Sequence, residues 1–216
     1  MHNEDGKKYK TYEKRATARV CCILVKTDTK EIVFNIPQDW QLLYLGLMPG
    51  RPDSPLKLIF TKITVDDRHL PCSTDDMETL LKNIHHSPLT ASMKEKLQYL
   101  IDLDFTEITV SLNLMPDNRY DSRIGFEVFV PEEGINPEET LKTERGQKLL
   151  KALTDWQMAD ARVNLLPECC DIFFPPPSPN CAEAQIQAFL NHIKLQWDKD
   201  EPLPAKAYIA CNSYFR

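Results

Sequence analysis

Polar and charged residues occupy every second position along several predicted strands of this 216-residue chain. When apolar and polar residues alternate in a strand, one face of the sheet packs on the core and the other collects the polar side chains. On that second face, Glu107 and Glu127 are candidate catalytic residues, because a carboxylate can act as a base. The candidates for binding a polar or anionic ligand are Arg123, Lys194, Lys206, Tyr208 and His192. The alternative is that these residues form an ordinary solvated face with cross-strand charge pairs.

The most regular stretch, residues 105–130, would position the two glutamates. Apolar residues recur at every second position over 108–114 and again over 124–130. A proline, an aspartate and an asparagine at 116–118 favour a turn between these two runs. Two alternating runs joined by a turn predict an antiparallel pair of strands. On the second, polar face of this pair, the small residue Gly125 would make room for a ligand.

The remaining elements are predicted from apolar periodicity and from turn residues. Strands are expected at 17–26, 31–36, 56–65, 192–197 and 205–211. Helices are expected at 74–85, 91–103, 138–153, 156–165 and 181–190, and residues 38–48 form either a short helix or an irregular segment packed on the sheet. The proline-rich run 173–179 is expected to be an extended loop.

This order of elements predicts an α+β fold, with an antiparallel or mixed sheet covered by helices on one face. A curved or barrel-like sheet is one form that it could take. Residues 1–14 are rich in lysine and glutamate without periodicity, and we expect a flexible lead-in there. Residues 15–216 are expected to form a single domain.

Composition argues against several classes of function. A net charge of −6 disfavours nucleic acid as a partner, since phosphate binding needs a basic surface. No apolar run approaches the roughly 20 residues that cross a bilayer, and the first residues lack the apolar core of a signal peptide, so a cytoplasmic protein is expected. The seven cysteines do not show metal-ligand spacing, and neither a metal nor a cofactor is predicted.

Two segments carry a resemblance to known proteins, IGFEVFV at 124–130 and HIKLQWDKDEPLPAKAYIAC at 192–211. They resemble a group of uncharacterised bacterial proteins associated with loci that make ribosomal peptide natural products. The resemblance implies an accessory or tailoring role in peptide maturation. The layout of hairpins and helices, with lysine and tyrosine on alternating strands, is also similar to that of antiparallel-barrel aromatic prenyltransferases.

Two functions follow as hypotheses. The first is a binding or accessory protein that holds a peptide or small ligand on a sheet face or an edge strand. The second is a small tailoring enzyme acting on a peptide or aromatic substrate, with Lys194, Lys206 and Arg123 holding an anionic group and Glu107 or Glu127 as the base. A homodimer paired through an exposed edge strand is a third possibility.

Overall fold

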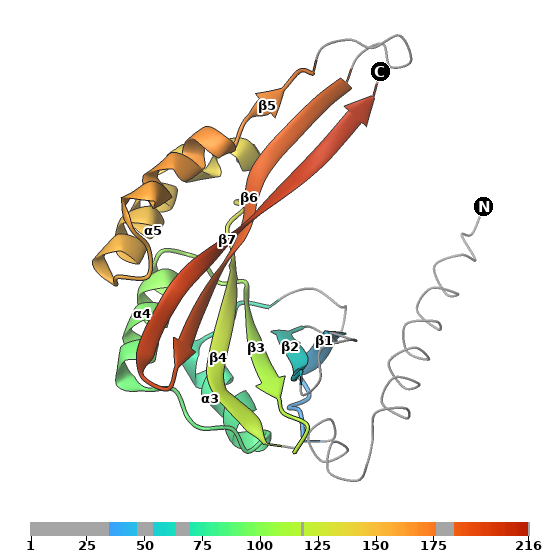
Figure 1. Ribbon diagram of the computed structural model, residues 1–216, viewed down its shortest axis with the longest axis vertical. Helices are drawn as coiled ribbons and strands as arrows, with labels where there is room; N and C mark the ends of the chain where they lie inside the picture. Colours follow the sequence, from blue (N-terminus) through green and yellow to red (C-terminus); the bar gives the residue numbers. More distant parts are fainter. Residues whose placement is uncertain (1–34, 47–53, 64–69, 118, 176–183, 216) are drawn as a thin grey trace, which may run out of the picture.

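The fold is α+β with an antiparallel sheet, as predicted. In the described residues the sheet has seven strands and is not closed, so the barrel-like form that the sequence left open is not adopted. The computed structural model describes residues 35–46, 54–63, 70–117, 119–175 and 184–215 (Figure 1). The strands are β1 (Trp40–Gly46), β2 (Leu56–Lys62), β3 (Ile108–Leu114), β4 (Tyr120–Phe129), β5 (Ile172–Phe173), β6 (Ala184–Asp198) and β7 (Glu201–Phe215). The helices in the described residues are α3 (Thr74–Asn83), α4 (Ala91–Asp102) and α5 (Glu144–Asp155), with 3₁₀ helices η1 (Pro137–Lys142) and η2 (Ala161–Cys169).

Strand β6 pairs with three other strands, β4, β5 and β7. Neighbouring strands run β1-β2-β3-β4-β6, and β7 pairs along the whole of β6. Because a strand has only two edges, β4 and β5 share the other edge of β6, at residues 192–198 and 186–187 respectively. Beyond β4 the two long strands project from the body of the protein (Figure 1). We call residues 184–191 and 209–215 the β6–β7 arm.

The apolar core lies between the described helices and one face of the sheet. A row of directly paired residues crosses this face, consisting of Phe60, Val110, Phe126 and Leu195, and all four are buried. Leucines and methionines of α3, α4 and α5 pack against it. Burial of each such side chain stabilises the fold by about 2 kcal/mol. The predicted layer of helices on one face is therefore present.

Side-chain caps set where the predicted helices begin. Ser73 and Asp76 form a capping box at α3, and the Thr90 hydroxyl accepts a hydrogen bond from the Met93 amide at α4. Thr143 caps α5 in the same way and divides the predicted helix 138–153 into η1 and α5. The helices predicted at 74–85 and 91–103 are confirmed. In the described residues no helix is long and apolar enough to cross a membrane.

Three predicted elements are wrong. Residues 38–48 contain strand β1, because a bulge between Leu42 and Tyr44 shifts the alternation and produces spacing that resembles a helix. Residues 184–190 belong to β6 rather than to a helix. The helix expected at 156–165 is instead η2, which begins at Ala161.

The predicted lead-in 1–14, the strand 17–26, most of the strand 31–36 and most of the proline-rich loop lie outside the described residues.

Candidate functional site

The second face of the sheet carries a cluster of charged side chains at its centre. Glu127 on β4 is directly opposite Lys194 on β6. The Lys194 Nζ atom lies 3.4 Å from Glu127 Oε1, and the Lys57 Nζ atom, from β2, lies 3.2 Å from the same oxygen. Lys194 also donates a 2.7 Å hydrogen bond to the Ser111 hydroxyl on β3. Lys57, Ser111, Glu127 and Lys194, which we call the lysine–glutamate cluster, thus join four neighbouring strands.

A glycine allows Lys194 to lie across the sheet. Gly125 is the residue of β4 opposite Ser111, and a Cβ atom built on it would lie 2.7 Å from Lys194 Cε. Real Cβ atoms do not approach so closely, so any larger residue at 125 would displace the lysine. Gly125 makes room on this face, and a side chain of the protein itself occupies that room.

The cluster holds more positive than negative charge in a buried environment. The side chains of Lys194 and Glu127 are only 6% and 5% exposed. Burial lowers the pKa of Lys194 to about 8, and the neighbouring Lys57 adds to this effect, while Glu127 opposes it. At pH 7 Lys194 is therefore still mainly protonated, and the two lysines share one carboxylate. Such burial of charge is costly unless every charge is paired.

Aromatic side chains border the cluster. His192 stacks on Tyr208 with ring centroids 4.3 Å apart, and the Phe129 ring centroid lies 5.7 Å from that of His192. Burial lowers the pKa of His192, so the ring favours its neutral form. Tyr44 on β1 is 52% exposed, and burial of part of its ring together with the charge of Glu127 raises its pKa. Aromatic rings therefore lie on both sides of the cluster, with Tyr44 on β1 at one side and His192 and Tyr208 on β6 and β7 at the other.

The structure brings some of the predicted site residues together and not others. Glu127 and Lys194 are in contact, His192 stacks on Tyr208, and Lys206 is opposite Lys194 on the edge strand. The remaining two candidates lie elsewhere.

Glu107 precedes β3, is exposed, and forms no ion pair with the described residues. Arg123 is 54% exposed and pairs with Asp121, four positions along β4 from Glu127. Sequence reasoning missed Lys57 and Tyr44. Lys57 could have been found, because it alternates with leucines in the correctly predicted strand 56–65, whereas the bulge hid Tyr44.

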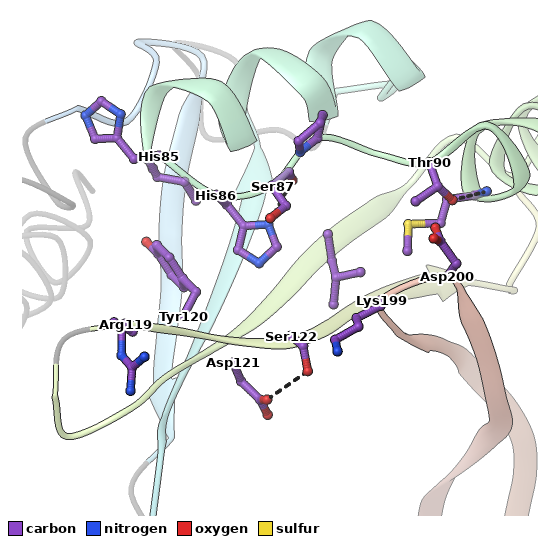
Figure 2. A pocket seen from close by; sticks show the side chains of 14 residues that line it. His85, His86, Ser87, Thr90, Arg119, Tyr120, Asp121, Ser122, Lys199 and Asp200 are labelled. Atoms are coloured by element: carbon purple, nitrogen blue, oxygen red, sulfur yellow. Dashed lines mark hydrogen bonds between the residues drawn. The ribbon is translucent and has the colours of Figure 1, made fainter.

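Apart from the cluster, a recess lies where three connections converge at the β3–β4 end of the sheet (Figure 2). It has a volume of about 720 Å³ and is lined by the link between α3 and α4, the start of β4, and the β6–β7 turn. Figure 2 shows the His86 ring beside the Tyr120 ring, and their centroids are 5.1 Å apart at a steep angle. Burial lowers the pKa of His86 and raises that of Tyr120, so both rings favour their neutral forms.

Many polar groups of this recess are already engaged by the protein. Arg119 pairs with Asp117, and the Ser122 hydroxyl donates a 2.6 Å hydrogen bond to Asp198. Asp121 accepts a hydrogen bond from Asn113 and also pairs with an arginine. The charged groups of this recess thus form one-to-one pairs, whereas the lysine–glutamate cluster holds two lysines for one carboxylate.

Comparisons of the chain with protein-family models, with curated proteins and with solved structures find no match. Within the described ranges, no group of three or more histidine, cysteine, aspartate or glutamate residues is placed to hold a metal ion. The functional argument therefore depends on the geometry of the second face.

Proposed function

We propose that this is a binding protein that holds a carboxylate-bearing peptide or small molecule on the second face of its sheet. The observation that carries the proposal is that two lysines share one carboxylate in the lysine–glutamate cluster. An anionic group of the ligand would pair with the surplus positive charge. Lys57 is the lysine it would reach first, because its side chain is 34% exposed while Lys194 is buried.

The aromatic border favours a ligand that also has a planar or apolar part. A peptide side chain could pack against the His192–Tyr208 stack or against Tyr44, while its carboxylate meets Lys57. The resemblance to proteins of ribosomal peptide loci makes maturing natural-product peptides the first class of ligand to test. The proposal keeps the cytoplasmic location that we expect from the sequence.

A small tailoring enzyme is the second candidate, and the low pKa of Lys194 favours it. Perturbed pKa values gather at catalytic sites because catalysis needs groups that titrate near neutral pH. In this alternative the lysines of the cluster hold an anionic group of the substrate, and Glu127 acts as the base.

Native mass spectrometry of protein purified from its own host tests the binding function. Under gentle conditions we expect a retained mass that disappears on denaturation and in Lys57→Met. The matched control is Lys148→Met, which changes a lysine on α5 that pairs with Glu144 and leaves the cluster intact. A ligand-free wild type, or equal retention by both variants, would contradict a site at the cluster.

Calorimetric titration with a defined probe separates the two candidates. The probe is a phenylalanyl-aspartate dipeptide, compared with a counterpart in which both carboxyl groups are amidated and which therefore carries no negative charge. Binding of the carboxylate form alone, with no change in its mass after incubation, supports a binding protein. If the wild type instead converts a retained host ligand to a product of different mass, and Glu127→Gln does not, the result would support the tailoring enzyme.

A further inference from the structure

Among the described residues, strand β7 forms a long edge of the sheet that pairs with β6 alone. Two prolines, Pro202 and Pro204, protect its first four residues. From Ala205 onward the strand has no proline, and Lys206 is its only charged residue up to Phe215. Natural edge strands are usually protected by prolines, charges or bulges, so this part of β7 has the features of a pairing surface.

Exposed apolar side chains also gather on and around the β6–β7 arm. Of the nine large exposed hydrophobic residues in the described ranges, three lie on β7, namely Tyr208, Ile209 and Tyr214. Two more, Phe173 and Phe174, lie at β5, which pairs with the other edge of β6 (Figure 1). Exposed apolar surface concentrated on one part of a protein marks an interaction site.

We propose that a second copy of this chain occupies the open edge, with the two β7 strands antiparallel about a two-fold axis at Ala210. Pairing residues 205–215 with themselves places the axis at the central residue of that segment. A two-fold axis gives the same surface on both subunits, as is usual for soluble dimers. The result is one sheet that continues through both copies.

The register about Ala210 agrees with the side-chain pattern of β7. Directly opposite residues in antiparallel strands point to the same face, and here every pair joins two even-numbered or two odd-numbered residues. The apolar face of one copy therefore continues into that of the other. Lys206 is opposite Tyr214 of the partner subunit, so no like charges face each other directly.

This pairing would also extend the second face around the lysine–glutamate cluster. Tyr208, whose ring stacks on His192, would be opposite the partner's Asn212. The partner's Tyr214 would lie opposite Lys206 on the same face. Each copy would thus add side chains to the border of the other's ligand face. The dimer does not depend on ligand binding, and its test is independent of the proposed function.

Disulfide trapping tests the register. In a Cys211→Ser background, Ala210→Cys places two cysteines directly opposite each other, at a Cα separation of about 4.5–5.5 Å that suits a disulfide. The control, Asn212→Cys, lies on the same face and is the more exposed of the two positions, but each new thiol is opposite the partner's Tyr208. We expect a covalent dimer from the first variant alone, with the 210–210 link confirmed by peptide mapping. Equal cross-linking of both variants would overturn the register.

Light scattering after size exclusion tests the dimer itself. The wild type and Ala210→Ser should have twice the mass of one chain. Ala210→Glu and Ala210→Lys, which place like charges at the axis, should each raise the dissociation constant by at least about tenfold. Mixing these two variants should restore the double mass, and circular dichroism checks that each is folded. A wild type with the mass of one chain, with or without a bound peptide, would overturn the proposal, as would a dimer insensitive to both charges.

Discussion

Replacing Lys194 by methionine should stabilise the folded protein at neutral pH. A pKa of about 8 in the folded state, against about 10.4 for a free lysine, corresponds to about 3 kcal/mol of unfavourable burial when the amine is charged. Methionine avoids this cost and fills a similar volume. It loses the hydrogen bond to Ser111, worth about 1 kcal/mol, while Glu127 keeps Lys57 as a partner. The expected gain is about 2 kcal/mol at pH 7.

The gain should disappear at alkaline pH. Between pH 8 and about 10.4 the unfolded chain holds the lysine proton and the folded chain has released it, so unfolding takes up a proton. The stability of the wild type therefore rises through this window, relative to Lys194→Met, by up to about 3 kcal/mol. The advantage of about 2 kcal/mol should become a deficit of about 1 kcal/mol near pH 10.5.

Urea unfolding of both proteins between pH 6 and 10.5 measures this difference. Lys206→Met is the control, because Lys206 is exposed on the next strand, and it should change stability by less than about 0.5 kcal/mol at every pH. A Lys194→Met protein that is less stable than wild type by the same amount at all pH values would refute the reasoning. It would show that Lys194 is a structural contact rather than a charge kept for binding.

Three further predictions concern the same core and face. Glu127→Gln leaves Lys194 without a carboxylate partner and should lower stability by about 2 kcal/mol at pH 7, and an unchanged urea midpoint would contradict the ion pairing. Gly125→Ala should cost about 1 kcal/mol, because the new Cβ moves the end of the Lys194 side chain away from its hydrogen bond to Ser111, and a loss that persists in a Lys194→Ala background would contradict this cause. In maleimide labelling followed by peptide mapping, exposed Cys169 should react in the native protein, whereas Cys72, which is buried and has its pKa raised to about 12, should react only after unfolding. Equal rates for the two thiols would mean that Cys72 is accessible.

Where alternation was unbroken, the sequence was sufficient to predict the fold. The pairing of β3 with β4 and the side of each glutamate follow from a strict period of two, and Ser73 and Thr90 mark where two helices begin. Prediction failed where the register shifts. The bulge after Leu42 gave β1 a helical spacing, and the alanines and glutamines before Leu190 favour a helix that pairing with β7 overrides.

The candidate site was predictable in part for the same reason. The alternation of side chains along each strand placed Glu127 and Lys194 on one face, but it does not show which strands are neighbours. Contact between them depends on β4 lying beside β6, a pairing between residues 67 positions apart. The surplus charge follows from Lys57: its alternation with leucines indicates the second face, but its contact with Glu127 across β3 depends on the strand order.

The pairing of β4 with β6 has a consequence for how the protein folds. The β3–β4 and β6–β7 hairpins are each closed by a short local connection, the second by a turn of Lys199 and Asp200 alone. Pairing of β4 with β6 joins the two hairpins and closes a long loop. The chain loses the conformational entropy of that loop before the Phe126–Trp197 contact can form. We therefore expect two hairpins that form early and a slow step in which they join. In a newly synthesised chain, the edge of β4 that later pairs with β6 would then stay exposed until β6 has left the ribosome.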